Sequence, residues 1–385
     1  MSVREVGVAD AIPMTTPPTP AAANSRATPR KLILGILGLV VVIYLLVLGS
    51  QALSIYASSI PKLMQAVLAS IGGVGGAAAL FYFLNMSVEG LPRRLSLGVI
   101  PYAFLLPAFG VLGVFLLYPA LQTIEYAFAN ADSTKFIGLE NFRTILGDQA
   151  FRTTLLNNLL WLALVPAVTV VIGTVIATLA DKLSARWEKI AKSLIFLPMA
   201  ISFVGAATIW NFVYAYKPKG QPQIGLLNAI VVKLGFDPIT WLQQDQFNLN
   251  DMLLMVIVLW LQTGFAMVLL SSAIKGVPGE TIEAARIDGA SELQIFFQVI
   301  IPQIQGTIIT VFITVLIMVL KVFDVVYVLT NGLYGTSVIG LDFFKQIFTY
   351  SDAGKASAIV VILLVAMLPV LLYQVHHFRE EEKTR

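Results

Sequence analysis

Residues 283–302 read EAARIDGASELQIFFQVIIP and form a polar, helix-patterned segment between two long apolar segments. Of the 385 residues in the chain, 57% are hydrophobic and only 12% are charged. An ordinary soluble domain carries about 25% charged residues, so this composition indicates an all-α polytopic membrane protein. Connections between packed helices are usually about 2–8 residues long, so a longer patterned segment favours a docking surface for another protein.

Eight apolar segments come close to the length of about 20 residues that crosses a hydrocarbon core. The expected spans are residues 32–49, 64–85, 100–118, 154–180, 193–213, 252–274, 304–326 and 356–375. The first two belong to an N-terminal transmembrane helix pair, residues 31–95, and a six-helix core follows over residues 96–385. Residues 72–79 (GGVGGAAA) give the second span a small-residue face suited to close helix packing. Residues 1–30 hold too little apolar surface to fold and are expected to be a disordered cytoplasmic tail.

Positive charge predicts the orientation of the spans, because cytoplasmic loops carry an excess of Lys and Arg. With the N-terminus inside, the inner segments hold fifteen of the 25 Lys and Arg residues. Both termini and the 278–302 segment are therefore expected to be cytoplasmic, in a multi-pass protein of the cell (inner) membrane. The net charge of +3 gives no case for nucleic acid as a partner.

The sequence offers no metal site and no bound cofactor. There is no cysteine, and the two histidines, His376 and His377, are adjacent at the end of the last span. Side chains at i and i+1 on a helix do not face each other, so this pair fits a membrane exit better than a metal centre.

Helix signals divide the polar segment into a helix, a turn and a second helix. Pro278 begins the first helix, which is expected over residues 280–288, and Gly289 suits the left-handed position after it. Ser291 and Gln294 form a capping-box pattern for the second helix, which Pro302 is expected to terminate.

The charges of this helix pair separate two alternatives. A helix lying on the inner membrane surface normally carries a face rich in Lys and Arg. Here Arg286 stands alone against four acidic residues, Glu280, Glu283, Asp288 and Glu292. Protein docking is therefore favoured, with Ala284 and Ala285 as a small surface that lets a partner approach the backbone.

The same residues resemble a known family. The sequence Glu283-Ala284-Ala285, then Gly289 and the run ending at Pro302, resembles the coupling motif of permease subunits of ATP-binding-cassette importers. The resemblance covers roughly residues 96–385 and extends to the carbohydrate branch, which includes the larger maltose permease subunit. Segments similar to that branch are residues 136–142, 196–198 and 329–332. Residues 157–161 and 209–227 are similar to permeases for α-glucosides or glucosylglycerol.

The resemblance implies a function and a set of partners. It implies a transmembrane permease subunit of an ATP-driven importer for a sugar, with coupling helices at 278–302. The implied partners are a second permease subunit, two ATPase subunits that bind ATP and Mg, and an extracytoplasmic solute-binding protein. The implied ATPase-coupling residues are Glu283, Ala284, Ala285, Arg286, Asp288 and Gly289. One departure is that Asn331-Gly332 is followed by Leu333-Tyr334-Gly335, where the family usually continues Gly-Pro.

Charged residues inside a span are costly and normally face an interior or a water-filled path. Lys321 and Asp324 meet that description, and their i, i+3 spacing leaves open a purely structural pairing. Tyr327, one turn further on, can stack on a sugar ring and offer a hydroxyl. The remaining substrate-path candidates are Gln262, Thr263 and Gly264 in the sixth span and Asn211 in the fifth, where Trp210 and Tyr214 also fit an interfacial belt.

No catalytic pattern is found in the sequence. A Gly-x-x-x-x-Gly-Lys-Ser/Thr phosphate loop is lacking, and Gly354-Lys355-Ala356 is the nearest fragment. The chain is therefore expected to be a transport subunit and no enzyme by itself. Two other classes stay open: an ion-coupled secondary carrier working without ATPase partners, which expects internal repeats and several charged spans, and a membrane scaffold or receptor.

Overall fold

The computed structural model describes residues 28–56 and 58–384, and the described residues are helical apart from turns and loops. The chain forms two compact units, Met1–Pro119 and Ala120–Arg385. The sequence predicted a core that begins at residue 96, whereas the two units divide after Pro119. The helix α3 (Arg93–Leu112) belongs to the first unit because it packs against α2 (Lys62–Glu89). Most of the expected disordered tail, residues 1–27, lies outside the described residues.

The first unit is built on an antiparallel pair, α1 (Pro29–Ile55) and α2, followed by α3 and a short π-helical turn, Gly113–Leu117. Gly76 approaches the side chain of Leu46 across this pair. In the part of the chain that the structure describes, a Cβ placed at Gly72, Gly73 or Gly75 would meet nothing within 4 Å. The small-residue face predicted for residues 72–79 is therefore used only in part within this unit.

The second unit contains α5 (Glu140–Gly147), α6 (Gln149–Ala180), α7 (Ala185–Phe196), α8 (Phe203–Tyr214), α9 (Leu226–Lys233) and α10 (Leu249–Lys275). It continues with α11 (Gly279–Ile287), α12 (Glu292–Gln294), α13 (Ile301–Gln303), α14 (Gln305–Leu320), α15 (Asp324–Leu329), α16 (Ile339–Phe348) and α17 (Ala353–Thr384). A short helix, α4 (Tyr118–Tyr126), crosses the boundary between the units.

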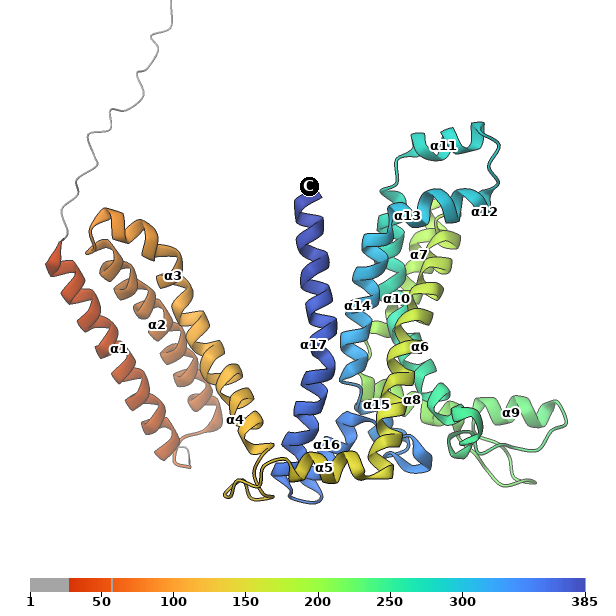
Figure 1. The fold of residues 1–385 in the computed structure, drawn as a ribbon, viewed down its shortest axis with the longest axis horizontal. Coiled ribbons are helices and arrows are strands. Elements are labelled where there is room, and N and C mark those ends of the chain that lie inside the picture. The colour runs from red at the N-terminus through yellow and green to blue at the C-terminus, as the bar shows by residue number, and fades with distance from the viewer. Residues whose placement is uncertain (1–27, 57, 385) are drawn as a thin grey trace, which may run out of the picture. The chain divides into compact units, whose positions relative to one another are not determined.

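The core of the second unit lies where α6, α10 and α14 pack together. Trp161, Leu254, Met267 and Val311 are fully or almost fully buried there. Gly173 permits the close approach of α6 to α10, because a Cβ at this position would lie 2.7 Å from the Cβ of Ala266. These helices run side by side, and α11 lies at the same end of the unit as the C-terminal end of α17, opposite α5, α9 and α16 (Figure 1).

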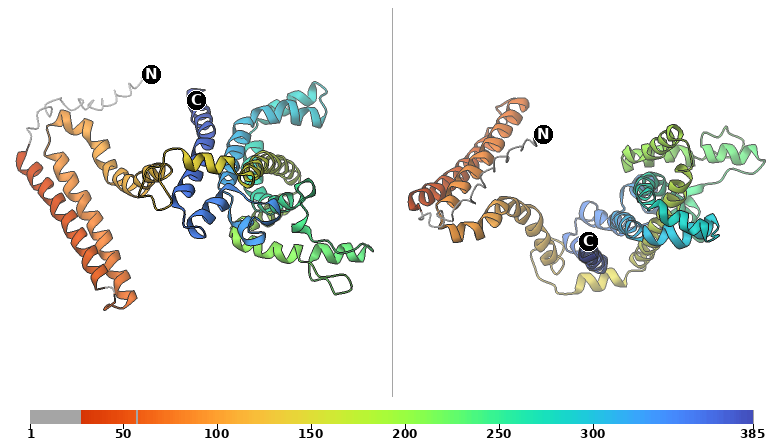
Figure 2. Two further views of the ribbon diagram at one scale, coloured as in Figure 1. Left: turned by 60° about the horizontal axis from the view of Figure 1, so that its bottom comes forward. Right: turned by 90° about the horizontal axis from the view of Figure 1, so that it is seen from above.

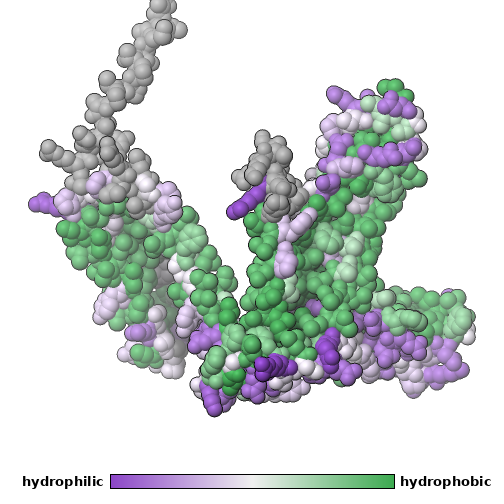
Figure 3. Space-filling model, in the orientation of Figure 1, coloured by the Kyte–Doolittle hydropathy of each residue, from purple (hydrophilic) through white to green (hydrophobic). Residues whose placement is uncertain are grey.

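The surface of this unit has the pattern of a membrane protein. Apolar side chains cover the long helices, and hydrophilic side chains gather at the α11 end and at the opposite end (Figure 3). Within the described residues, six helices are long and apolar enough to cross a membrane, or eight if two bent helix pairs each count as one span. The prediction of a polytopic all-α membrane protein is confirmed.

Two of the expected spans are interrupted. The fifth, residues 193–213, bends by 103° between Ala200 and Phe203, after the 3₁₀ turn Leu197–Ala200 that contains Pro198. The seventh, expected over residues 304–326, ends at Leu320, and Asp324 begins a separate helix. Proline lacks the N–H that continues a helix, which accounts for the first break. Phe323, with φ −149° and ψ −55°, marks the second break.

Candidate functional site

The polar helix pair folds largely as the sequence predicts. The first helix, α11, follows Pro278, and Gly289 takes the left-handed conformation with φ +80°. The Ala290 N–H then donates to the Ala285 carbonyl at 3.0 Å, which closes the helix. Ser291 forms the predicted capping box, because its N–H donates to Gln294 Oε1 at 2.8 Å and its Oγ accepts from the Gln294 N–H.

The end of the second helix differs from the prediction. Its middle, Ile295–Ile300, is π-helical, and the helix passes through Pro302 to end at Gln303, where α14 continues at 70°. The wider π turn accommodates the proline, whose ring would otherwise clash with the carbonyl four residues earlier.

The residues predicted for ATPase coupling lie together on this pair. Five of them are exposed and one is half-buried: Glu283, Ala284, Arg286, Asp288 and Gly289, with Ala285 as the half-buried member. Arg286 Nε donates to Glu292 Oε1 at 3.0 Å, so its partner is on the second helix. Ile287 is 86% exposed, and the sequence reading missed it, although a large apolar residue between Arg286 and Asp288 was a signal for a contact surface.

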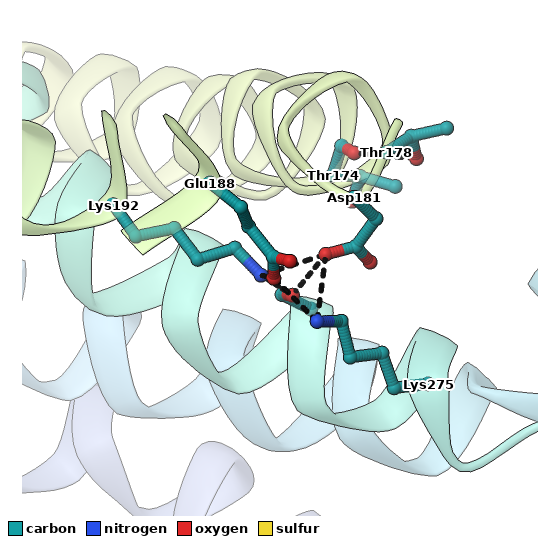
Figure 4. A network of polar contacts seen from close by, with 7 residues as sticks. Thr174, Thr178, Asp181, Glu188, Lys192 and Lys275 are labelled. Carbon is teal, nitrogen blue, oxygen red and sulfur yellow. Dashed lines mark hydrogen bonds and ion pairs between the residues drawn. The ribbon is translucent and has the colours of Figure 1, made fainter. Parts of the chain in front are cut away.

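An ion network lies where the helix pair joins the unit (Figure 4). Lys192 Nζ contacts Asp181 Oδ1 and Glu188 Oε1, each at 2.6 Å, and it also donates to Ser271. Lys275, the last residue of α10, pairs with the same Glu188. We call these five residues the base network.

The base network connects three helices, since Asp181 caps the C-terminal end of α6, Glu188 and Lys192 belong to α7, and Ser271 and Lys275 to α10. A carboxylate at a helix C-terminus is electrostatically unfavourable, so Asp181 depends on its cations. The sequence reading missed this network. The i, i+4 pair Glu188 and Lys192 was visible, but Asp181 and Ser271 meet only through tertiary packing.

The predicted path residues on α10 have different surroundings. Gln262 is half-buried and points its amide at Met318 of α14, with Nε2 2.7 Å from the sulfur. The hydroxyl of Thr263 is used by the backbone, because it donates to the Leu259 carbonyl. Gly264 is a packing position, since a Cβ there would lie 2.7 Å from the Cα of Phe196 on α7.

The structure separates Lys321 from Asp324. Lys321 terminates α14 and Asp324 begins α15, and no ion pair within 4.0 Å joins them among the described residues. The structural pairing that their i, i+3 spacing left open is therefore not formed, because the helix breaks between them. Both line a cavity of about 30 Å³ together with Val258 of α10.

The other two path candidates, Tyr327 and Asn211, lie in aromatic-rich parts of α15 and α8. Tyr327 stacks on Phe323 with ring centroids 5.1 Å apart and is 42% exposed. Asn211 is exposed on α8, and its neighbour Trp210 meets Trp260 of α10 at 5.9 Å. The helix break at Lys321 and the bend before α8 thus meet beside α10, because Phe203 of α8 lines the same cavity as Lys321 and Val258.

At the end opposite α11, α6 holds a long connection in place. Asn157 donates to the Ser337 carbonyl at 2.9 Å, and the Asn158 side-chain oxygen accepts from the Ile339 N–H at 2.7 Å. Thr154 donates to Asp342 at 2.7 Å, and burial raises the pKa of that carboxyl above its usual range.

Comparison with known proteins places this architecture in a family. Residues 170–380 match the family described as binding-protein-dependent transport system inner membrane component. The chain belongs to this family. The permease is therefore a multi-pass inner membrane protein, and the family consists of transport components. The predicted kinship with carbohydrate permeases of ATP-binding-cassette importers is confirmed.

Two relatives are similar over most of the permease. The osmoprotective compounds uptake permease protein GgtC of Synechocystis sp. is 48% identical over 282 residues, which cover 73% of this chain and 100% of the relative. The alpha-glucoside transport system permease protein AglF of Rhizobium meliloti is 42% identical over 334 residues, covering 83% and 98%. A solved bacterial ABC transporter involved in alginate import shares the fold, with a TM-score of 0.65 at 22% identity over 74% of this chain and 99% of that one.

Proposed function

We propose that this permease is the transmembrane subunit of an ATP-driven importer for a neutral sugar, of the α-glucoside, di- or oligosaccharide or glucosylglycerol class. The observation that carries the proposal is the exposed α11, which presents Glu283, Ala284 and Gly289 at one end of a membrane unit of this family. The named substrates of relatives support the sugar class, since AglF is an alpha-glucoside permease.

In this proposal α11 and the following helix dock onto ATPase subunits in the cytoplasm. Two ATPase subunits bind ATP and Mg, a second permease subunit completes the path, and an extracytoplasmic binding protein delivers the solute. Glu283, Arg286 and Asp288 supply charge to the docking surface, and Ile287 supplies an apolar contact. ATP drives transport because it binds better to one arrangement of the ATPase pair than to the other.

The proposed topology follows from the same assignment. The bent pair α7 and α8 counts as one span and α14 as another, which with the six long helices gives eight crossings, with both termini cytoplasmic. The N-terminal pair, residues 31–95, is an addition to the permease core over residues 96–385, and residues 1–30 form a cytoplasmic tail. The location of the C-terminal end of α17 at the α11 end supports this orientation (Figure 1).

The proposed sugar path runs along α10 between the two broken helices. Gln262 offers an amide, Lys321 and Asp324 offer charged hydrogen-bonding groups at the break, and Tyr327 offers an exposed ring. Asn211 lies at the outer part of this path. Thr263 and Gly264 shape the path indirectly. The Thr263 hydroxyl bonds to the backbone of α10, and Gly264 allows the backbone of α7 to pack closely against α10.

The decisive experiment purifies the complex through a tag on this chain and measures its ATPase activity with the cognate binding protein. A panel of α-glucosides, glucosylglycerol and unrelated solutes is tested. Stimulation by one neutral glycoside supports the importer and names its solute. A chain that purifies without any ATPase would overturn the proposal and favour an ion-coupled carrier.

A charge reversal tests the docking surface. Glu283→Lys is expected to abolish uptake and recovery of the ATPase subunits while leaving membrane insertion intact. Glu140→Lys makes the same charge change at the opposite end of the unit and is expected to retain both. Normal uptake by Glu283→Lys would remove the docking assignment.

A further inference from the structure

The short helix α9 is fastened to the end of a span. Gly225, just before it, lies so close to Ala215 that any side chain there would collide with the Ala215 carbonyl, and Ala215 caps the C-terminus of α8. Asn228 of α9 is buried and donates to the carbonyls of Ala215 at 3.0 Å and Ile239 at 2.9 Å. The Ile239 N–H returns a bond to Asn228 at 2.8 Å. These contacts hold α9 at the level where α8 ends.

The free side of α9 is apolar. Leu226, Ile230 and Leu234 follow at intervals of four residues and so share a face, and they are 58%, 48% and 69% exposed. Lys233 is the charged residue of the helix and lies in its last turn. The one other polar side chain, Asn228, faces the protein. In water this helix would leave a row of large aliphatic groups unburied.

Two ribbon views show the direction of α9, and a space-filling view shows the hydropathy of the surface around it. In Figure 1 α9 runs across the direction of the long helices, and in the right view of Figure 2 those helices are seen nearly end-on while α9 is seen lengthwise. Figure 3 shows that the projecting part of the unit that contains α9 is hydrophobic on the side toward which the long helices extend and hydrophilic on the other side. The apolar face of α9 therefore continues the apolar belt of the spans.

We infer that α9 is an interfacial membrane helix whose free face binds the phospholipid layer at the end of the unit opposite α11. Leu226, Ile230 and Leu234 enter the acyl region, while the Lys233 stem lies along it and its ammonium reaches the phosphates. Lys219 and Asp237, on the exposed loops beside the helix, form an ion pair at 2.7 Å, and both charges stay in water. The inference requires membership of the membrane family and does not depend on the transported solute.

Lipid is the occupant that the geometry supports. The face is continuous with the belt that the bilayer must cover, and it lies at the level where a span ends. A protein partner that bound to this face of α9 would have to displace lipid from the same side of the helix. The lipid contact fixes α9 at the membrane surface and so sets the height of the loops that follow α8.

The absence of cysteine in the sequence allows a direct test. Single nitroxide labels are placed by Ile230→Cys and, as the control on the exposed polar loop, Gln221→Cys, in the full complex in nanodiscs of phosphatidylethanolamine and phosphatidylglycerol. Collision with oxygen and with a water-soluble nickel chelate gives the depth of each label. The Ile230 label is expected about 5–10 Å below the phosphates, as for interfacial helices, and the Gln221 label in water.

Leu226→Cys repeats the measurement on the same face, so a folding defect in one variant does not decide the result. Equal access of the nickel chelate to labels at Ile230, Leu226 and Gln221 would overturn the inference. The inference would also be overturned if the labels at Ile230 and Leu226 were accessible to water in nanodiscs and became protected only when the binding protein was added. That result would favour a protein-docking helix.

Discussion

Replacing Lys192 by Met should destabilise the permease by removing the cation that joins two carboxylates of the base network. Met keeps most of the aliphatic volume and no charge. Lys192 Nζ lies 2.6 Å from both Asp181 Oδ1 and Glu188 Oε1. In the variant Lys275 alone faces both carboxylates, and its distance to Asp181 Oδ1 is 3.8 Å. Asp181, at the negative end of the α6 dipole, is then left poorly compensated.

The magnitude follows from burial. The side chains of Lys192, Asp181 and Glu188 are only 19%, 14% and 16% exposed. Breaking a buried ion pair costs about 3–5 kcal/mol, and an exposed pair is worth about 0–1 kcal/mol. Because Lys275 still neutralises part of the charge, we expect the free energy of unfolding to fall by about 2–3 kcal/mol. Lys275→Met, whose side chain is 52% exposed, should cost under about 1 kcal/mol.

Reversible denaturation by dodecyl sulfate in mixed micelles measures these differences. Lys189→Met is the matched control, because Lys189 is exposed on the same helix. Combining Lys192→Met with Asp181→Asn should recover about 1–2 kcal/mol relative to the sum of the single changes, since the unpaired carboxylate is then gone. Strict additivity, or a Lys192→Met cost no larger than that of Lys275→Met, would refute the reasoning.

Three further outcomes are expected. Gly264→Val should cost about 1–3 kcal/mol of stability, because its side chain meets the backbone of Phe196; an unchanged denaturation midpoint would contradict this contact. Gln262→Ala and Tyr327→Ala should raise the solute concentration for half-maximal uptake without loss of ATPase assembly; unchanged kinetics in both would place the path elsewhere. Burial raises the pKa of Asp342, so folding favours the protonated form of this carboxyl. The wild-type protein should therefore lose stability relative to Asp342→Asn as the pH rises from the ordinary pKa of 3.8 through the raised pKa of the folded protein. Parallel pH profiles of the thermal midpoint would contradict that assignment.

Local signals in the sequence predicted the local structure well. The glycine at 289 and the capping box of Ser291 and Gln294 act within one turn, so their outcome depends little on the rest of the chain. Hydropathy located the apolar segments for the same reason, because it is a property of about 20 consecutive residues. It could not show that the segments at 193–213 and 304–326 are broken, since apolar residues continue on both sides of each break.

Contacts between distant residues were out of reach. The base network joins Asp181 to Ser271, 90 residues apart, and only the packing of α6 on α10 brings them together. The pairing of Lys321 with Asp324 that their spacing left open is not formed for a related reason: it requires helical geometry across a point where the helix ends. Gly264 was a substrate-path candidate in the sequence, and only the packing of α10 on α7 shows that the backbone of α7 lies against it.

The arrangement of α10 suggests how the proposed coupling would reach the sugar path. This helix is unbroken over 27 residues, or about 40 Å, and it carries Lys275 of the base network at one end and Gln262 near its middle. The helices beside it, α7 with α8 and α14 with α15, are interrupted at the level of the proposed path. A displacement of α11 would therefore pass along α10 as a rigid rod, while the breaks absorb the change in direction. Loosening the base network by Lys192→Met should accordingly weaken solute stimulation of the ATPase more than it weakens basal ATPase activity. Equal loss of both would show that the network only stabilises the fold.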